Sequence, residues 1–356
     1  MHENQSPKSN SETTGSFQEK KMLLIAGAVI IVLVLIIIVG ISAYFIGKYI
    51  SDKTDNTIAE KLSSDIDTTN LEEDMIFKEE TEAIPNWIQD NPNSENKGPW
   101  YSGLYISEST DGLNFTNEKL FLEHSGVANL IVTSDNKLIA TFQYFSFVNQ
   151  DMFDIIAYTV SEDNGKTWSS VKPVNITGLS AGESPNGCDP TLVELEEGRF
   201  RLYFTYHQVG EEYPQLFSAI GDSIDSKFLS EGQQLLTDEI ILDPAVIYFD
   251  DMWHHYTVKH GESFENEPNE NPISVHSTSE DGLAFELVDE ITLDMQFLGD
   301  VIEDDGGIRF YNGSDSAFST DGYNWVQDEG ERVQGADPGV VKLDDGTYLI
   351  IYTKVN

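Results

Sequence analysis

Short runs of alternating apolar and polar residues, separated by turn residues, fill the chain from residue 99 to its end. The turns between these runs carry Asp-Gly, Asp-Asn or Glu-Gly pairs. Alternation on both sides of such a pair is typical of two antiparallel strands joined by a tight turn. The pattern therefore predicts an all-β domain over residues 99–356.

One phrase recurs along this domain: a polar turn that contains Asp and Gly and is followed by an aromatic residue. It occurs at residues 107–115, 161–168, 279–285 and 319–325. Glycine accepts positive φ, Asp and Ser side chains cap the turn amides, and the aromatic side chain packs below the turn. The residues that we expect to shape these turns are Asp111, Gly112, Asp163, Gly165, Trp168, Asp281, Gly282, Asp321, Gly322 and Trp325.

A second phrase alternates with the first and begins with an aspartate, usually followed by Pro, an apolar strand, a turn and another apolar strand. Full copies begin at Asp189, Asp243 and Asp337, and weaker copies begin at Val127 and at Gly299. One hairpin of each kind makes a four-stranded sheet. The predicted sheets are 127–176, 189–236, 243–292 and 299–332.

A fifth sheet is split between the two ends of the domain. Its first hairpin is the C-terminal segment 337–355, and its second is the segment 101–122. A ring of radial sheets protects its edges by closing on itself, and this split provides the closure. Because fixed-period repetition marks a repeat architecture, we expect a five-bladed β-propeller in which the N-terminal hairpin completes the last blade.

The charge balance narrows the class of partner. The chain has 20 basic and 62 acidic residues, a formal net charge of −42. Such a field repels phosphate backbones, so we expect no nucleic-acid partner. Cys188 is the only cysteine, which excludes an intramolecular disulfide and a Cys-based zinc site. We interpret it as a small core residue rather than a nucleophile.

An apolar segment before the domain predicts a membrane anchor. Residues 22–46 contain no charged side chain, and ~20 apolar residues are enough to span a bilayer as a helix. Lys20 and Lys21 precede the segment as interface residues do. A cleavable signal peptide has an apolar stretch of only about 7–15 residues, although Ser42-Ala43 leaves cleavage open.

The anchor sets the expected domain order and location. Residues 1–21 form a short cytoplasmic tail, 22–46 a transmembrane signal-anchor helix, 47–98 an acidic stalk, and 99–356 the propeller. The lysine pair before the span and the acid-rich segment after it favour a cytoplasmic N-terminus. We therefore expect a single-pass protein of the cell membrane with its propeller outside the cytoplasm.

Both phrases resemble those of known propellers. The turn phrase, best preserved at Ser161–Trp168, resembles the Asp-box (BNR repeat) of sialidase-type propellers. Its alternation with the Asp-Pro phrase resembles the five-bladed superfamily of glycoside hydrolase families 43, 32 and 68, which includes arabinanases and invertases. The resemblance covers residues 99–356 and implies that the Asp-box aspartates are structural rather than catalytic.

The catalytic pattern of family 43 is incomplete in this chain. That pattern has a base Asp in the first blade, a pKa-tuning Asp in the second and an acid Glu in the third. By position Asp189 matches the second-blade residue, the base position falls at Ala128-Asn129, and Glu262 is a candidate acid. The invertase Asn-Asp-Pro phrase is missing, and four arginines offer little for the three-arginine clamp of sialidases. The weak catalytic candidates are Asp189, Asp243 and Glu262.

Aspartates at equivalent or nearly equivalent places in the blades predict an acidic mouth on the central channel. Converging carboxylates raise one another's pKa, and they also suit calcium or another hard cation. Alternatively, each aspartate caps its own strand start by binding backbone amides. The ligand or cation candidates at this mouth are Asp189, Asp243, Asp300, Asp337, His207 and His260, with His124 and Glu183 in neighbouring loops.

A possible metal motif at Trp253-His254-His255 is not expected to bind metal, because adjacent strand residues point to opposite faces. The sequence then favours a membrane-anchored, surface-exposed propeller that binds or processes glycans. Such a protein is either a degenerate or divergent glycoside hydrolase or a carbohydrate-binding module. The alternative is a non-enzymatic surface scaffold for protein–protein interaction.

Overall fold

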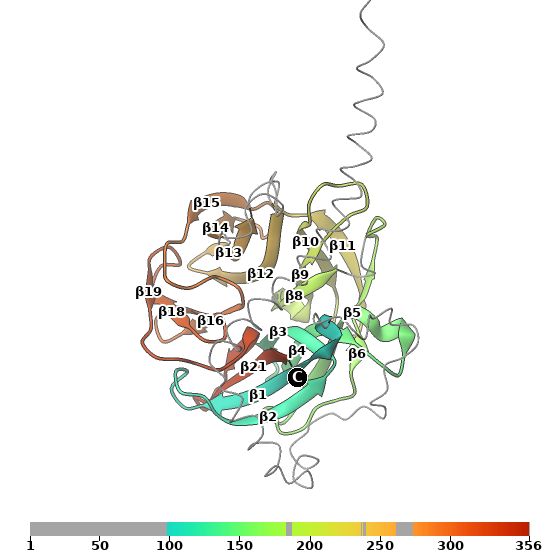
Figure 1. The fold of residues 1–356 in the computed structure, drawn as a ribbon. Helices are drawn as coiled ribbons and strands as arrows, with labels where there is room; N and C mark the ends of the chain where they lie inside the picture. The colour runs from blue at the N-terminus through green and yellow to red at the C-terminus, as the bar shows by residue number, and fades with distance from the viewer. Residues whose placement is uncertain (1–97, 183–186, 236, 238–239, 261–272, 356) are drawn as a thin grey trace, which may run out of the picture. The chain divides into compact units, whose positions relative to one another are not determined.

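The computed structural model describes residues 98–182, 187–235, 237, 240–260 and 273–355, which form five antiparallel-based β-sheets around one axis (Figure 1). The innermost strands contact one another in the cyclic order β3, β8, β12, β16, β20 and back to β3. The predicted five-bladed β-propeller is therefore confirmed.

Four blades are continuous in the sequence. Blade 1 contains β3 (Ser125–Val132), β4 (Leu138–Phe145), β5 (Phe153–Ser161) and β6 (Lys172–Pro173). Blade 2 contains β8 (Cys188–Glu194), β9 (Phe200–Tyr206), β10 (Gln215–Gly221), β11 (Lys227–Gln233) and the edge strand β7 (Asn175–Thr177). Blade 3 contains β12 (Ile240–Phe249), β13 (Met252–His260), β14 (Ile273–Ser279) and β15 (Glu286–Glu290). Blade 4 contains β16 (Asp300–Asp304), β17 (Gly307–Tyr311), β18 (Ser316–Ser319) and β19 (Trp325–Gln327).

Blade 5 joins the two ends of the domain, as the split repeat predicted. It contains β20 (Ala336–Lys342), β21 (Tyr348–Val355), β1 (Ser102–Ser109) and β2 (Thr116–Glu123). The strand β1 pairs with β21 along its whole length, from Ser102 opposite Val355 to Ser109 opposite Tyr348. Figure 1 shows these segments side by side although they lie at opposite ends of the domain. Short 3-10 helices are η1 (Pro99–Tyr101), η2 (Gln150–Met152) and η3 (Glu196–Gly198).

One strand does not follow the predicted blade boundaries. The sequence pattern placed residues 127–176 in blade 1, but the outer strand of that blade ends at Pro173. After Val174, which is buried, β7 crosses to blade 2 and pairs in parallel with β11. The crossover covers the outer edge of blade 2, and a covered edge strand is protected from pairing with another chain.

The Asp-Pro phrase proves to be a β-bulge rather than a strand start. In β8, β12 and β20 the strand begins one to three residues before the aspartate, and its pairing register shifts across the Asp-Pro pair. Proline lacks the N–H that a regular ladder needs and is tolerated at bulges. The prediction of a Pro-started strand was wrong for this reason, and β3 has the same bulge without either residue.

The repeated turns connect the third and fourth strands of a blade. In the first of them, the Asp111 carboxylate accepts from the Leu113 and Asn114 amides at 2.9 and 2.8 Å. The Ser109 hydroxyl donates to the same carboxylate and accepts from the Gly112 amide at 3.1 Å. These bonds give the aspartates of the turns structural partners in the blade itself.

Tyrosines of the preceding blade bind three of these turns. The hydroxyl groups of Tyr203, Tyr256 and Tyr311 donate to the carbonyl groups of Gly282, Gly322 and Gly112, at 2.8, 2.8 and 3.0 Å. All three tyrosines are fully buried in the second strand of their blade. The turns therefore connect neighbouring blades, a role that the local pattern did not reveal.

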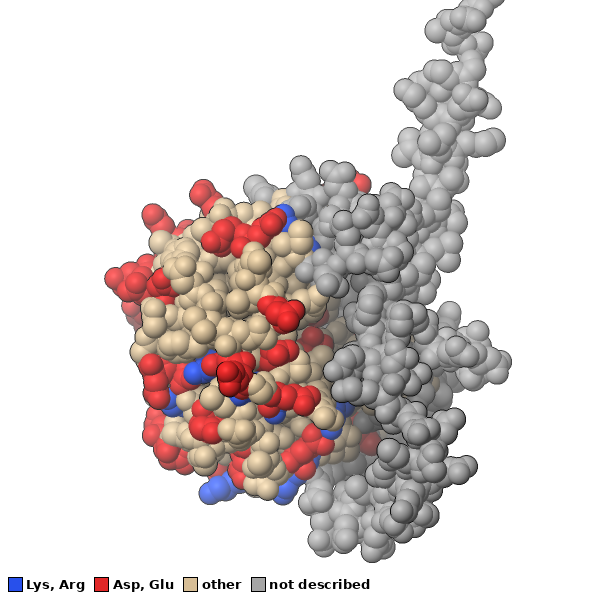
Figure 2. All heavy atoms as spheres, turned by 60° about the vertical axis from the view of Figure 1, so that its left-hand side comes forward, with Lys and Arg blue, Asp and Glu red and all other residues tan. Residues whose placement is uncertain are grey.

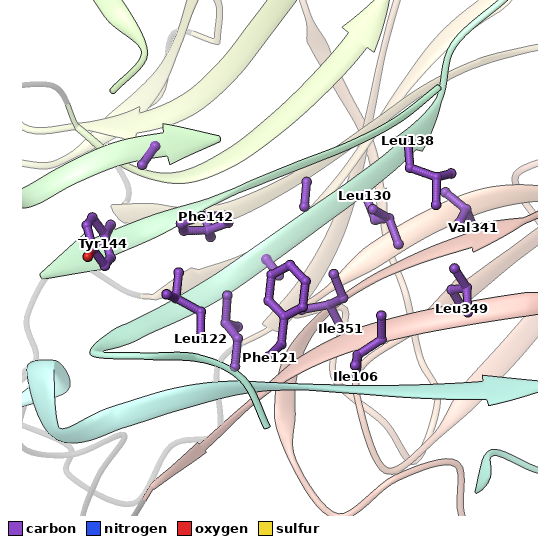
Figure 3. Close-up of a cluster of buried hydrophobic side chains, with 14 of the residues drawn as sticks. Ile106, Phe121, Leu122, Leu130, Leu138, Phe142, Tyr144, Val341, Leu349 and Ile351 are labelled. Carbon is purple, nitrogen blue, oxygen red and sulfur yellow. The ribbon is translucent and has the colours of Figure 1, made fainter. Parts of the chain in front are cut away.

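A hydrophobic cluster fills the junction where the ring closes, between blade 5 and blade 1 (Figure 3). Phe121 and Ile351 from blade 5 and Phe142 from blade 1 are fully buried in it. Burying apolar surface yields about 25 cal/mol per Å², so this cluster stabilises the contact between segments that are far apart in the sequence.

Closure also requires a close backbone approach at Gly339 in β20. A Cβ atom added to Gly339 would lie 2.7 Å from backbone atoms of Asn129 and Leu130 in β3. Because the neighbouring atoms are backbone, they cannot move aside as a flexible side chain can. We expect Gly339→Ala to lower the free energy of unfolding by about 1–3 kcal/mol, the usual cost of overpacking.

Chemical denaturation of the purified protein measures this change. Gly126→Ala is the matched control at the same junction, because its added Cβ would meet only the Thr353 side chain at 3.5 Å. Equal stability of the two variants would show that β20 and β3 are not packed as closely as this structure has them.

The predicted anchor and stalk, residues 22–46 and 47–98, lie outside the described residues, apart from Gly98 at the end of the stalk. Within the described ranges, no helix has the length and apolar character needed to cross a bilayer.

Candidate functional site

The five inner strands surround a small cavity at the axis. Its volume is about 10 Å³, which is roughly the room that one water molecule needs. Its lining comes from all five blades or the segments that lead into them. The lining residues are Val127, Ala128, Asn129, Asp189, Pro190, Thr191, Asp243, Pro244, Gly299 and Asp337.

Several residues that line the cavity have strained backbone conformations. Val127, Asp189, Asp243 and Asp337 have φ values of 48°, 53°, 53° and 47°, and Gly299 before blade 4 has φ 147°. A non-glycine residue at positive φ is uncommon, and for a β-branched residue such as Val127 it is an outlier. The same strained bulge thus recurs in four of the five blades. In each of them it brings the residue with positive φ to the axis.

Asp189 and Asp243 form a coupled pair. The Asp189 carboxylate accepts hydrogen bonds from the Thr205 hydroxyl and from the backbone N–H of Asp243, and it shares a hydrogen bond with the Asp243 carboxyl group. Burial raises the pKa of Asp189. Burial and the charges of Asp189 and Asp337 raise the pKa of Asp243 well above its usual value. Of the two residues, Asp243 is therefore the one whose protonated form is more strongly favoured, and in that form it donates to the Asp189 carboxylate.

Asp337 completes the mouth without a partner of its own. Burial, with a smaller contribution from the charge of Asp189, raises the pKa of Asp337 to about 6. Among the described residues, no side chain or backbone group donates a hydrogen bond to its carboxylate. Neither Asp243 nor Asp337 caps the amides of its own strand, whereas Asp300 does, because it accepts from the Val301 amide. Strained groups with raised pKa values that converge on a cavity are typical of functional sites.

Asp300 does not lie at the mouth, although the sequence pattern placed it there. Its side chain is 3% exposed, and its carboxylate accepts from the Val301 and Val340 amides at 2.9 Å and from Asn129 Nδ2 at 3.2 Å. Burial raises its pKa to about 7. The pattern was misleading because Gly299 occupies the place of the bulge residue, and β16 pairs with β17 without a register shift.

Asn129 and Asp300 together join four blades beside the mouth. Asn129 of blade 1 also accepts from the Leu192 amide of blade 2 at 2.9 Å, while Asp300 of blade 4 accepts from Val340 of blade 5. Both polar atoms of the Asn129 side chain are therefore bonded within the fold.

The predicted histidines take other positions. His207 lies in the loop after β9, where its Nε2 is 3.2 Å from the Glu211 carbonyl, and it does not line the cavity. His124 stacks on Phe147 with ring centroids 3.6 Å apart, also away from the cavity lining. His260 ends β13, and its side chain is outside what the structure describes. Glu183 and Glu262 lie outside the described residues.

Cys188 lies beside the acidic pair. Its Sγ is 3.3 Å from Asp189 Oδ2 and 3.8 Å from the Thr205 carbonyl. Burial and the nearby aspartates raise the pKa of this thiol well above its usual value. Because the thiolate is the nucleophilic form, the environment of Cys188 suits a packing residue.

A metal at the mouth stays a prediction. Within the described ranges no group of three or more His, Cys, Asp or Glu side chains is placed to hold a metal ion. The opposite orientation of the adjacent histidines is confirmed: His254 contacts His276 at 2.9 Å, whereas His255 contacts Ser277 at 2.8 Å.

Threonines that support the bulges were missed by the sequence reasoning. Thr205 Oγ1 accepts from the Asp243 amide at 3.2 Å, and Thr353 Oγ1 accepts from the Val127 amide at 3.0 Å. Each threonine belongs to the blade before the bulge that it supports. The signal was present, because a threonine follows an aromatic residue at the end of both second strands.

No protein-family model and no curated protein sequence matches the chain. A thermostable family-43 glycoside hydrolase is similar at a TM-score of 0.48 and 11% identity, over 64% of this chain and 88% of that one. A GH43_1 enzyme from Xanthomonas citri gives 0.49 and 15%, over 65% and 86%. A Hadza microbial sialidase gives 0.44 and 15%, over 68% and 60%. At these identities the likeness concerns the fold alone.

Proposed function

We propose that this chain is a membrane-tethered, surface-exposed propeller that binds glycans at its axial mouth and does not hydrolyse them. The observation that carries the proposal is the set of three carboxyl groups that line the cavity, of which Asp189 and Asp243 are joined by a hydrogen bond and Asp337 has no described donor. These groups are held together against their mutual repulsion by bulges that the fold repeats.

The mixed protonation of the mouth suits sugar hydroxyl groups. A hydroxyl both donates and accepts hydrogen bonds, a carboxylate only accepts, and a protonated carboxyl also donates. Binding sites fix small polar ligands with a few such convergent groups. The Asp243 proton is used in the bond to Asp189, whereas the Asp337 carboxylate has free acceptor positions to which a sugar hydroxyl can donate.

The size of the mouth sets the mode of binding. A cavity of about 10 Å³ has no room for a sugar ring, since it holds roughly one water molecule. We infer that the glycan lies across the mouth and inserts a single hydroxyl group, which is about the size of the water molecule that such a volume can hold.

The geometry argues against hydrolysis by this pair. Two carboxyl groups that share a hydrogen bond, as Asp189 and Asp243 do, are much closer than the ~5–5.5 Å of retaining or the ~6.5–9.5 Å of inverting glycosidases. Blade 1 offers Asn129 in place of a base, and both of its polar atoms are bonded within the fold. No aromatic residue is among the described residues that line the cavity.

The tether rests on the sequence of residues 20–46. Two lysines precede an apolar segment that is long enough to span a bilayer. Extraction of cell membranes with alkaline carbonate tests this part of the proposal. The chain is expected to stay with the membrane pellet, and its release into the supernatant would contradict the tether.

A non-enzymatic scaffold for protein partners is the second candidate, and a surface feature favours it. Figure 2 shows Asp and Glu side chains spread over much of the visible face of the propeller, with few Lys and Arg between them. Complementary charge steers association, so a partner with a basic surface would be attracted to this face. This candidate needs no role for the axial mouth.

The experiment that separates these functions combines a glycan array with assays of chromogenic arabinosides, xylosides and sialosides, using the full chain in detergent. We expect array binding and no glycoside turnover. Turnover that disappears in Asp189→Asn would establish a glycoside hydrolase instead. Absence of glycan binding, together with a cross-linked protein partner, would establish the scaffold.

A further inference from the structure

Blade 3 carries a buried histidine cluster that the axial mouth does not involve. His254 in β13 and His276 in β14 are each 1% exposed. His276 lies opposite Asp289 of the outer strand β15 in the strand register. Side chains of directly paired residues in antiparallel strands lie on the same face of a sheet. The two histidines and the aspartate thus share one face, and the Asp289 side chain is half-exposed at 50%.

Hydrogen bonds assign the protonation of both rings. One ring N–H of His254 donates to the Phe249 carbonyl, and its Nδ1 lies 2.9 Å from His276 Nε2. A neutral imidazole has one donor and one acceptor nitrogen. Since His254 already donates to Phe249, its Nδ1 accepts, and His276 must donate from Nε2. His276 Nδ1 therefore carries a lone pair.

That lone pair has no hydrogen-bond partner. His276 Nδ1 is buried and unbonded within the described part of the chain. The nearest charged group is the Asp289 carboxylate, with Oδ1 at 3.6 Å. Two acceptors that face each other at this distance repel, and the separation is too long for a hydrogen bond. Leaving a buried acceptor unsatisfied is unfavourable, and a cation between Nδ1 and the carboxylate would satisfy both groups.

The separation fits a bridging metal ion. Zinc takes histidine nitrogen at about 2.0–2.1 Å and carboxylate oxygen at about 2.0–2.2 Å in a tetrahedral arrangement. Two such ligands around one ion lie roughly 3.4 Å apart, close to the observed distance. Tyr256 stacks on the His276 ring at 4.8 Å and Tyr323 meets its edge at 4.9 Å. These contacts hold the imidazole in place before an ion binds.

We propose that His276 Nδ1 and the Asp289 carboxylate are the two protein ligands of a first-row divalent cation of the zinc type, with water completing its coordination. Imidazole with carboxylate suits such ions better than it suits calcium. A metal-bound histidine almost always donates its other ring N–H to a fixed acceptor, and His254 provides that acceptor. The charges of Asp250 and Asp321 act on His254, the residue that accepts from His276.

Zinc binding to the full chain tests the site, measured by competition with a chromophoric chelator. We expect one equivalent of Zn²⁺ in the parent protein and at least tenfold weaker binding of that equivalent in Asp289→Asn. Glu290→Gln is the matched control, because Glu290 neighbours Asp289 on β15 but pairs with Lys259 at 3.3 Å. Asp289 is half-exposed, so its substitution is not expected to prevent folding.

Electron paramagnetic resonance with Cu²⁺ gives a second reading that does not depend on affinity. Coupling to one imidazole nitrogen is expected in the parent protein and in Glu290→Gln, and it should be lost in His276→Gln. Zinc binding by Asp289→Asn that equals binding by the parent would overturn the proposal. If neither the parent nor Asp289→Asn binds zinc, a proton on His276 pairs with Asp289 instead of a metal ion. If both proteins bind zinc equally well, the zinc lies elsewhere.

Discussion

Replacing Asp300 with alanine is expected to lower the free energy of unfolding by about 4 kcal/mol at pH 4.5. The change leaves three buried donors without an acceptor, namely the Val301 and Val340 amides and Asn129 Nδ2. Each unsatisfied buried group costs about 1–3 kcal/mol. Asp300 is expected to have this effect because its carboxylate joins blade 4 to the first and last blades of the ring.

The cost of Asp300→Ala should shrink as the pH rises. The pKa of Asp300 is raised to about 7 in the folded protein, against about 3.9 for an unperturbed aspartate. A carboxyl group with a raised folded pKa contributes stability that is fully present below the unfolded pKa and is lost as the pH rises through the folded pKa. The parent loses this contribution between roughly pH 4 and pH 7, whereas the variant has none to lose.

Urea denaturation of both proteins at pH 4.5 and pH 8 measures this difference. Asp305→Ala is the matched control, because Asp305 is an exposed neighbour whose contact is a surface ion pair with Lys342. Such pairs contribute about 0–1 kcal/mol. A loss below 1 kcal/mol in Asp300→Ala at pH 4.5 would show that the Asp300 carboxyl group does not join the blades.

Replacing Asp337 with asparagine is expected to raise the free energy of unfolding by about 1–3 kcal/mol at pH 8, a change opposite in sign to that of Asp300→Ala. Burial and the charge of Asp189 raise the pKa of Asp337 to about 6, so its ionised form is unfavourable in the folded state. The stability that this group contributes is present below about pH 4 and is lost as the pH rises through about 6. Asparagine avoids that loss, since it carries no charge.

The same substitution at pH 3.5 should leave the free energy of unfolding nearly unchanged, because Asp337 is then protonated. Asp344→Asn, on the exposed turn of the same hairpin, is expected to change neither value. If Asp337 instead capped backbone amides, its replacement would destabilise the protein at both pH values. A gain in stability when a residue is removed is typical of a group that is kept for function.

Hydrophobic alternation and turn phrases were sufficient to predict the ring, its five blades and its closure. The reason is that each blade repeats the same two hairpins, and β1 could only satisfy its edge against β21. The crossing of β7 to blade 2 could not be predicted, because three residues carry too little periodicity to specify a partner strand. The bonds from Tyr203, Tyr256 and Tyr311 to the next blade could not be predicted either, because an apolar strand pattern does not show where a buried hydroxyl group donates.

The acidic mouth was predicted in part. Asp189, Asp243 and Asp337 share a phrase and meet at the cavity, as equivalent positions in a ring should. The prediction that Asp300 lies at the mouth was wrong because Asp300 comes one residue after the bulge position, where the side chain is buried. Only the regular pairing of β16 with β17 shows this difference. The cluster of His254, His276 and Asp289 lies on three strands with no common phrase, so its geometry required the structure.

Glycan binding at the axial carboxyl groups is tested most directly by calorimetric titration. The glycan that binds most strongly on the array is titrated into the parent protein, Asp337→Asn and Asp305→Asn. We predict at least a tenfold loss of affinity in Asp337→Asn and parent-like affinity in Asp305→Asn. The same affinity in all three proteins would contradict the assignment of glycan binding to the axial carboxyl groups.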